Sequence, residues 1–408
     1  DARLHAIPPY DRYIGRRDLW ALSRVVVAMD RAAPAAQNRF LLFGGCLRAL
    51  PAKPAHLLTC FARPLWGAPY AVHRDLLTSR NDPPAGPAAG DDDDESMNSL
   101  VSRRLGSALD DNVVFAVING IYAADTRVLS SRAVATPLWQ AERSTGSVLL
   151  GLLLPLEGRP SDPDGGLEAA SMHLFRGGMQ TLTDQLAERL ANSPNGLAVA
   201  EPSSDGNSGD RGGGFSIGFE GGAQIRADYL VSALPEVQLG SLLESWATAS
   251  PLSPPLPRLV YKGASMAVAQ SGFGFFVPRA ASREAKALEA VFDSCMLPEQ
   301  GGRADISRFA VMLGGTHFRD TLGDPATILQ ADLLRHAMDT MRRVLGVSKE
   351  PVLAAAHVQR QCIPVYPVGY IDMLEKVDQW LMCGFGGRLS VMGAAYGGQS
   401  IPSWNCLP

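Results

Sequence analysis

The sequence predicts a mixed α/β enzyme whose domains are interleaved along the chain. Three features predict this class: helical periodicity in residues 96–156 and 328–345, strand patterns between residues 215 and 234, and a second group of strand patterns between residues 259 and 313. Helices that alternate with two separate groups of strands are typical of an α/β protein with more than one sheet. The 408 residues are enough for roughly two or three domains.

Composition excludes several classes of function. Hydrophobic residues make up 46% of the chain and charged residues 19%, which is typical of a globular protein rather than a disordered one. The net charge is −4 and no basic cluster occurs, so we expect no nucleic-acid partner. The six cysteines include no C-x-x-C pair and the seven histidines no H-E-x-x-H pattern, so the sequence predicts neither a metal site nor a disulfide framework.

A short apolar hairpin with an arginine at its mouth lies near the N-terminus. Residues 40–43 and 46–50 are strand-like, and Gly44 and Gly45 between them supply the positive φ angles of a tight turn. Arg39 directly precedes the first strand, and a guanidinium can bind a carboxylate through two parallel hydrogen bonds. The alternative is an ordinary surface arginine or a member of an internal ion pair.

Two polar segments separate the structured parts of the chain. Residues 81–95 contain an acidic run, residues 203–214 are rich in Ser, Gly and Asp, and both are expected to be solvated loops. Between them, residues 96–156 are predicted to be helical. The most apolar run there, residues 148–156, is about half as long as a membrane-spanning helix. It is expected to form a buried helix end, with a place at a membrane surface as the alternative.

The remaining elements follow from periodicity. Apolar residues three and four apart predict a helix over residues 179–190. Short apolar or alternating runs bounded by Gly or Pro predict strands at residues 215–219, 225–234, 259–268, 273–277, 308–313, 352–357 and 389–392. The first two of these strands are expected to form a hairpin through a turn at residues 220–222.

No side-chain acid, base or nucleophile occurs in a catalytic context. The chain has no G-x-S-x-G elbow and no GxxxxGK[ST] phosphate loop, and its histidines are isolated. Glycine beside apolar residues recurs instead, and glycine lets a backbone approach a flat ligand closely. We therefore predict a site for a large, flat, apolar molecule that carries carboxylates, with Arg39 at the rim. The predicted lining residues are Phe273, Gly274, Phe276 and Met312. Such a site suits hydride transfer to a bound cofactor, because the cofactor carries the hard step.

Several short segments carry a resemblance to a known family. They are residues 35–40, 120–127, 177–178, 231–235, 272–274, 311–315 and 362–366. In these segments, and in their order along the chain, the sequence resembles the oxygen-dependent, FAD-containing protoporphyrinogen oxidases of eukaryotes, within the flavin amine oxidase superfamily.

The resemblance implies a function and a set of site residues. It implies oxidation of protoporphyrinogen IX to protoporphyrin IX with FAD and O2, releasing H2O2, in haem biosynthesis. By resemblance, Arg39 holds a substrate propionate, Phe273, Gly274 and Phe276 flank the macrocycle, and Met312 lies beside it. The residues implied to bind FAD are Gly177, Gly178, Ala395, Tyr396, Gly397 and Gly398. A homodimer attached to one side of the mitochondrial inner membrane is also implied.

The resemblance further implies how the chain divides into domains. It also shows which motifs of the family this sequence lacks. The implied parts are an FAD-binding, Rossmann-like domain at residues 1–33, 166–240 and 371–408, a helical membrane-contacting domain at 34–165, and a substrate-binding sheet domain at 241–370. The family's G-x-G-x-x-G loop has no counterpart in this sequence, and its last helix is not matched. Two alternatives are therefore kept: an inactive porphyrin-binding remnant without FAD, and another flavin-dependent amine oxidase.

Overall fold

The computed structural model divides the chain into two compact units. Unit 1 comprises residues 1–28, 173–250 and 371–408, and unit 2 comprises residues 29–172 and 251–370. The structure describes residues 26–30, 37–50, 73–75, 94–153, 170–175, 180–191, 215–218, 224–236, 238–239, 258–262, 272–296, 305–359 and 362–397. The chain crosses between the units in two paired strands, β1 (Val26–Asp30) and β4 (Ala170–Phe175), which the sequence patterns did not predict.

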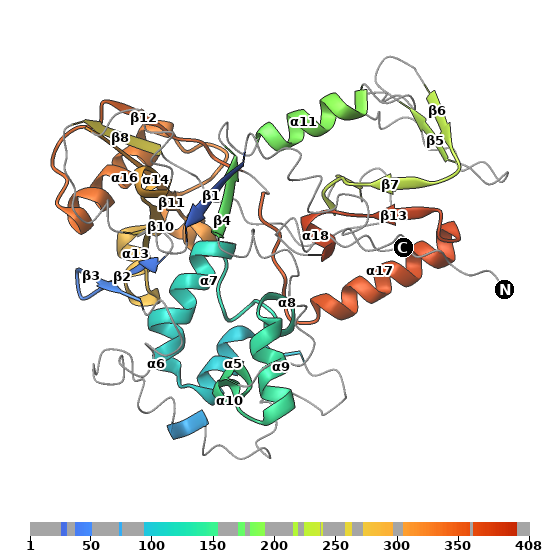
Figure 1. Cartoon of the computed structure of the whole chain (residues 1–408), viewed down its shortest axis with the longest axis horizontal. Helices are drawn as coiled ribbons and strands as arrows, with labels where there is room; N and C mark the ends of the chain where they lie inside the picture. The colour runs from blue at the N-terminus through green and yellow to red at the C-terminus, as the bar shows by residue number, and fades with distance from the viewer. Residues whose placement is uncertain are drawn as a thin grey trace. The chain divides into compact units, whose positions relative to one another are not determined.

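A seven-stranded sheet forms the centre of unit 2 (Figure 1). Its order is β12-β8-β11-β10-β9-β2-β3, and the strands are β2 (Phe40–Phe43), β3 (Cys46–Ala49), β8 (Arg258–Lys262), β9 (Gly274–Phe276), β10 (Ala287–Val291), β11 (Ile306–Leu313) and β12 (Leu353–Ala355). All neighbours are antiparallel except β2 and β9, which are parallel. The sheet therefore joins the N-terminal hairpin to strands that lie more than 200 residues later in the sequence.

The expected hairpin is confirmed as β2 and β3. Gly44 and Gly45 have φ angles of 58° and 75°, which residues with a Cβ rarely adopt. The ladder continues beyond the strands, since the Leu50 amide donates to the Arg39 carbonyl at 2.7 Å. Arg39 is thereby held in register with the sheet.

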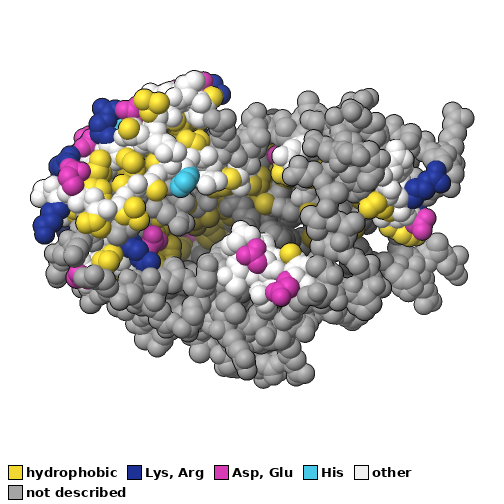
Figure 2. Space-filling view, turned by 90° about the horizontal axis from the view of Figure 1, so that it is seen from above, with side chains coloured by type: hydrophobic (Ala, Val, Ile, Leu, Met, Phe, Trp, Pro, Cys, Tyr) yellow, Lys and Arg dark blue, Asp and Glu magenta, His cyan; other side chains and the backbone are white. Residues whose placement is uncertain are grey.

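One face of the sheet packs against α16 (Gln330–Leu345). Phe309, Val311 and Leu313 of β11 share a buried cluster with Leu333 and Met341 of α16. The helix follows the predicted periodicity and ends at Gly346, whose φ of 68° suits a left-handed helix cap. Its outer side carries exposed ion pairs, and Figure 2 shows cationic and acidic side chains mixed on the surface seen from above.

The predicted helical region of unit 2 is a series of short helices. They are α5 (Met97–Arg104), α6 (Ser107–Leu109), the π-helix η3 (Asp110–Val114), α7 (Phe115–Tyr122), α8 (Ser131–Val134), α9 (Thr136–Thr145) and α10 (Val148–Leu153). Left-handed residues end two of them, Ala123 after α7 and Gly146 after α9. In α10 Val148 is buried whereas Leu150 is 43% exposed, so only part of the apolar run packs inside. Among the described residues, no helix combines the length and apolar character needed to cross a bilayer.

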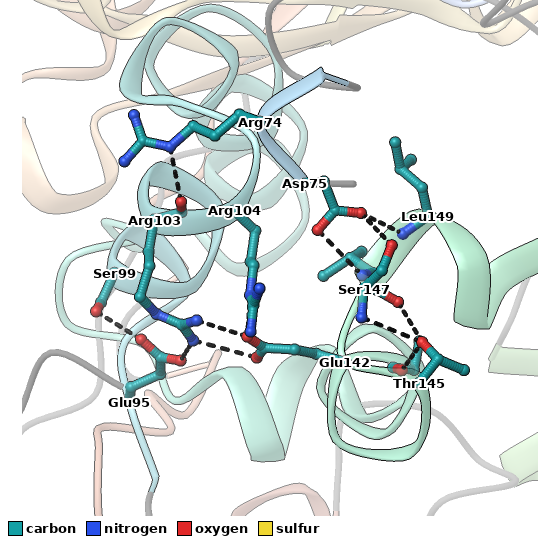
Figure 3. A network of polar contacts seen from close by, with 12 residues as sticks. Arg74, Asp75, Glu95, Ser99, Arg103, Arg104, Glu142, Thr145, Ser147 and Leu149 are labelled. Carbon is teal, nitrogen blue, oxygen red and sulfur yellow. Dashed lines mark hydrogen bonds and ion pairs between the residues drawn. The ribbon is translucent and has the colours of Figure 1, made fainter. Parts of the chain in front are cut away.

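A buried network of ion pairs and hydrogen bonds links helix α5 to helix α9 (Figure 3). Glu142 of α9 accepts from Arg103 Nη1 at 2.6 Å and also pairs with Arg104, and Arg103 pairs with Glu95. Burial acts to raise the pKa of Glu142, but hydrogen bonds with Arg103 and Arg104 outweigh it and hold that pKa below its ordinary value of 4.5. The network adds polar contacts to a small apolar cluster of the same helices, which contains Met97, Val101 and Ala135.

Short helices fill the connections of the sheet in unit 2. They are α13 (Arg279–Ala285), α14 (Asp293–Met296), the 3-10 turn η5 (Gly315–His317) and α15 (Phe318–Leu322). Residues 81–93, most of the first polar loop, lie outside the described residues, as do residues 203–214.

Unit 1 contains two small sheets and two longer helices. Its elements are α11 (Gln180–Ala191), β5 (Phe215–Gly218), β6 (Gln224–Ala227), β7 (Leu230–Ser232), α17 (Tyr370–Phe385), β13 (Leu389–Val391) and α18 (Ala394–Gly397). α17 begins at the boundary with unit 2 and was not predicted, and its Val377 and Leu381 form the buried cluster of this unit with Leu389 and Val391.

The expected return strand at residues 225–234 is wrong as a single element. β6 pairs with β5 as predicted, but a bend at Asp228 and Tyr229 ends that hairpin. β7 instead pairs in parallel with β13, about 160 residues away in the sequence. Parallel pairing connects distant segments, so local periodicity could not distinguish the two halves.

Candidate functional site

Arg39 and Phe273, both predicted as site residues, lie together in unit 2. The guanidinium carbon of Arg39 is 5.3 Å from the ring centroid of Phe273, a cation–π contact. The Phe273 amide donates to the Asn38 carbonyl at 2.8 Å, which ties the two segments by their backbones. Arg39 and Phe273 are more than 230 residues apart in the sequence, and they meet because β2 and β9 are neighbours in the sheet.

The two glycines beside Phe273 are required by close packing. A Cβ on Gly272 would lie 2.6 Å from the Phe40 ring, and one on Gly274 would lie 2.0 Å from the Ala290 carbonyl oxygen. Gly274 thus lets β9 approach β10. This structural requirement accounts for Gly274 by itself, and its role beside a ligand stays a prediction.

A row of side chains crosses the sheet on the face opposite α16. By strand register the row runs through Met312 of β11, Glu289 of β10, Phe276 of β9 and Leu41 of β2. Register partners on neighbouring strands place their side chains on one face of the sheet. We call this row the cross-strand row. It contains two predicted site residues, Phe276 and Met312, with Glu289 between them.

Helix α7 covers part of the cross-strand row. Phe276 is 4% exposed and shares a buried cluster with Leu41 and with Ala116 of α7. A Cβ on Gly120 would lie 2.7 Å from Cδ1 of Phe276, so the absence of a side chain at Gly120 allows this approach. Phe276 is therefore a core residue beneath α7, whereas Met312 is only partly buried.

Glu289 was not among the predicted site residues. Its side chain is 7% exposed, and burial raises its pKa to about 8, so the carboxyl is mostly neutral at pH 7. Perturbed carboxyls in apolar surroundings are common at functional sites. One sequence signal was available, because Glu289 stands alone as an acid in the apolar run Ala287–Val291.

Arg279 forms a second cluster of charges that is structural in character. Its guanidinium bonds Asp125 at 2.6 Å, Asp111 at 2.7 Å and Asp110 at 3.2 Å, and it stacks 4.0 Å from the ring centroid of Phe115. Burial raises the pKa of Asp110, against the opposing effect of its hydrogen bonds. Each of the three carboxylates bonds the guanidinium, although Oδ1 of Asp110 has no hydrogen-bond partner among the described residues, and the cluster joins α13 to the segment 110–126.

Part of the implied FAD set can be located in unit 1. Ala395, Tyr396 and Gly397 form α18, just after the carboxyl end of β13, whereas Gly177, Gly178 and Gly398 lie outside the described residues. Crevices at the carboxyl ends of parallel strands are where open α/β sheets bind ligands.

Two observations in unit 1 fit a cofactor there. The Tyr396 hydroxyl is buried and has no hydrogen-bond partner among the described residues, and burial, with Glu236 as a smaller cause, raises its pKa to about 12. Gly393, with a φ of 123°, leaves open space where a side chain would stand, since the nearest atom to a Cβ there is 4.0 Å away. An unpaired donor beside an open glycine suits a ligand rich in hydrogen-bonding groups, as FAD is.

Comparison with known proteins places the chain among similar sequences and structures. A family model described as flavin containing amine oxidoreductase matches residues 29–370. Protoporphyrinogen oxidase of Bos taurus is 33% identical over 386 residues, covering 90% of this chain and 76% of that protein. Protoporphyrinogen oxidase of Homo sapiens is 32% identical over 395 residues with the same coverage.

A solved structure from Exiguobacterium sp. 255-15 shares the fold. It has a TM-score of 0.69 and 18% sequence identity, and the match covers 95% of this chain and 81% of that one. At this identity the likeness concerns the fold alone.

Proposed function

Because this chain belongs to the flavin-containing amine oxidoreductase family, and within it to the protoporphyrinogen oxidases, we propose that it oxidises protoporphyrinogen IX to protoporphyrin IX with O2. It is an FAD-dependent oxidoreductase. The observation that carries the substrate proposal is the contact of Arg39 with Phe273, which places a cation against an aromatic ring beside an apolar sheet face.

The residues of unit 2 supply binding and orientation. The Arg39 guanidinium suits a propionate carboxylate, and a charge-assisted bidentate contact stabilises a complex by about 1.5–3 kcal/mol. Apolar contact with Phe273 and Met312 stabilises the macrocycle by about 25 cal/mol for each Å² buried. Apolar burial thus provides most of the affinity and Arg39 the orientation.

The residues of unit 1 that would hold FAD are Tyr396 and the backbone from Gly393 to Gly397, together with the predicted Gly177, Gly178 and Gly398. The chemistry that FAD supplies when bound is acceptance of a hydride and re-oxidation by O2 with release of H2O2.

Reconstitution tests the proposal. The purified chain is incubated with FAD, and protoporphyrinogen IX is added in air. We expect bound flavin absorbance, porphyrin fluorescence that grows faster than in a protein-free control, and H2O2. Porphyrin binding without any turnover would favour the inactive porphyrin-binding alternative, and turnover of amines in place of porphyrinogen would favour the other amine oxidase.

A place at a membrane surface is the second part of the proposal. We propose that the protein is a peripheral, dimeric protein of the mitochondrial inner membrane, acting in haem biosynthesis, with the helices of residues 97–153 as its membrane-contacting part. The half-exposed apolar side chains of Ile121, Val128 and Leu150 support it. Flotation with phosphatidylcholine–cardiolipin vesicles, sedimentation and fractionation of cells test these points. A chain that stays at the bottom of the gradient would argue against membrane contact.

A further inference from the structure

Glu289 is a buried carboxyl without a partner. It is 7% exposed in the middle of the cross-strand row, and neither a hydrogen bond nor an ion pair joins it to another described residue. Burial alone shifts its pKa, to about 8, with no opposing charge. Buried polar groups in folded proteins are nearly always paired, so an exception calls for an explanation.

A second unpartnered polar group lies on α7, the helix that covers part of the cross-strand row. Asn119 of α7 is fully buried, and neither its amide nitrogen nor its amide oxygen has a hydrogen-bond partner among the described residues. The next residue, Gly120, would place a Cβ 3.0 Å from Oε2 of Glu289. Gly120 therefore lies close to the Glu289 carboxyl, and the residue before it in α7 carries a buried amide without a partner among the described residues.

The position of Glu289 relates it to the proposed substrate site. Its register partners are Phe276 and Met312, two of the predicted substrate-binding residues. Arg39 stands two residues before Leu41, the other end of the cross-strand row. Two strand spacings and two residues of rise separate Glu289 from Arg39, which is about 12 Å between Cα atoms. A tetrapyrrole macrocycle that carries propionates on its rim is wide enough to span such a distance.

We propose that Glu289 is a further substrate-binding group, supported by Asn119 of α7, and that its carboxylate accepts hydrogen bonds from the pyrrole N–H groups of a porphyrinogen. This inference rests on the proposed function, because it takes a tetrapyrrole as the ligand. The inference gives the Glu289 carboxyl a binding role, which neither the apolar packing of the cross-strand row nor the Arg39 contact explains.

The chemistry of the ligand gives Glu289 a discriminating role. Every pyrrole nitrogen of a porphyrinogen carries a hydrogen and is a donor. In the oxidised porphyrin half of the nitrogens instead present a lone pair, which repels a carboxylate. An acceptor at Glu289 therefore favours the reduced substrate over the product, because a donor-rich ligand satisfies its oxygens and the product does so only in part.

The proposal carries a defined pH dependence. The elements packed against Glu289 are α7, β9 and β11, and their titratable side chains are Tyr122 and Arg308. Burial raises the pKa of Tyr122 above its ordinary value of 10. Among the described residues of β10 and of these elements, Glu289 is the group whose pKa lies at about 8. Donors favour its ionised form, so affinity for porphyrinogen rises as pH increases through about 8 and levels above it.

Binding measurements under nitrogen test the proposal. The full chain is titrated with protoporphyrinogen IX and, separately, with protoporphyrin IX, by quenching of tryptophan fluorescence from about pH 6 to about pH 10. We expect Glu289→Gln to abolish the rise in porphyrinogen affinity with pH and to lower the substrate-to-product affinity ratio about tenfold. Asn119→Leu is expected to weaken porphyrinogen binding while the pH profile remains.

The control is Glu284→Gln, the same exchange at an exposed carboxylate five residues earlier, which is expected to leave both ligands and the pH profile unchanged. If the wild-type chain binds tetrapyrroles and Glu289→Gln has the same pH profile and the same substrate-to-product affinity ratio, this inference alone is overturned. Glu289 would then contact water and not the ligand. Failure of the wild-type chain to bind either tetrapyrrole would overturn the proposed function and this inference with it. Should Glu289→Gln not fold, the Asn119→Leu result decides, since unchanged porphyrinogen affinity there contradicts the proposal.

Discussion

The guanidinium of Arg39 lies 5.3 Å from the ring centroid of Phe273, so the hairpin of residues 40–49 and strand β9 meet where the substrate is proposed to bind. Cation–π contacts of this kind contribute about 0.5–1 kcal/mol when exposed to solvent. The contact orients the arginine against the ring, and a cation–π contact does not remove the positive charge.

Arg39→Ala is expected to raise KM for protoporphyrinogen about 10- to 100-fold, because a charge-assisted bidentate contact of about 1.5–3 kcal/mol is lost. The KM of Arg39→Lys should lie between those of the wild type and Arg39→Ala, because lysine keeps the positive charge and lacks the planar guanidinium that makes two parallel hydrogen bonds. Steady-state kinetics measure both. Arg48→Ala on β3, an exposed arginine of the same hairpin, is the control and should leave KM unchanged. Equal KM values for wild type and Arg39→Ala would exclude the propionate role.

Gly120→Ala is expected to destabilise the protein by about 1–3 kcal/mol, because the new Cβ would lie 2.7 Å from Cδ1 of Phe276. Urea unfolding followed by circular dichroism measures the change. Gly384→Ala in α17 is the matched control: its Cβ would meet nothing within 4 Å, so a helical alanine should be neutral or stabilise by up to about 1 kcal/mol. Similar losses in the two variants would contradict the close packing of α7.

Glu142→Gln is expected to lower the free energy of unfolding by about 3 kcal/mol at pH 7, because Arg104 is left buried without its carboxylate. The pKa of Glu142 is depressed in the folded state, so its contribution is present above its ordinary value of 4.5 and disappears as pH falls through the lower folded value. Urea unfolding at neutral pH and near pH 3 measures this, and the variant should approach wild type at the lower pH. Asp339→Asn, which removes an exposed pair, should cost under about 1 kcal/mol. A deficit that is independent of pH would rule out ionic stabilisation by Glu142.

Tyr396→Phe is expected to separate folding from cofactor binding. Removal of a buried hydroxyl that has no partner among the described residues should leave the stability of the FAD-free chain unchanged or raise it by about 1 kcal/mol. If the hydroxyl contacts FAD, the dissociation constant should rise about 3- to 10-fold, as measured by flavin fluorescence quenching. Trp380→Phe, a half-exposed aromatic on α17, serves as control and should not change FAD affinity. An unchanged FAD affinity in Tyr396→Phe would remove the hydroxyl from the cofactor site.

The hairpin and helix α16 show what local patterning can predict. Gly44 and Gly45 specify a turn through their own backbone freedom, and the four-residue spacing of Leu333, Ala337 and Met341 specifies one buried helix face. Both signals depend on residues close in sequence. The sequence patterns did not predict strand β10 or helices α13 and α17. β10 and α13 are short, and α17 follows a segment whose Gly and Pro residues obscure the hydrophobic periodicity.

The sequence by itself determined the α/β class, the family and the identity of Arg39, Phe273, Phe276 and Met312 as candidates, since each follows from local motifs. Only the tertiary structure decided that Phe276 packs beneath α7 and that Glu289, unpaired among the described residues, stands between Phe276 and Met312. Sheet pairing joins β2, β9, β10 and β11 across long loops, and burial of a carboxyl depends on all the strands and helices around it. Such neighbours are set by long-range packing, which no window of residues along the chain contains.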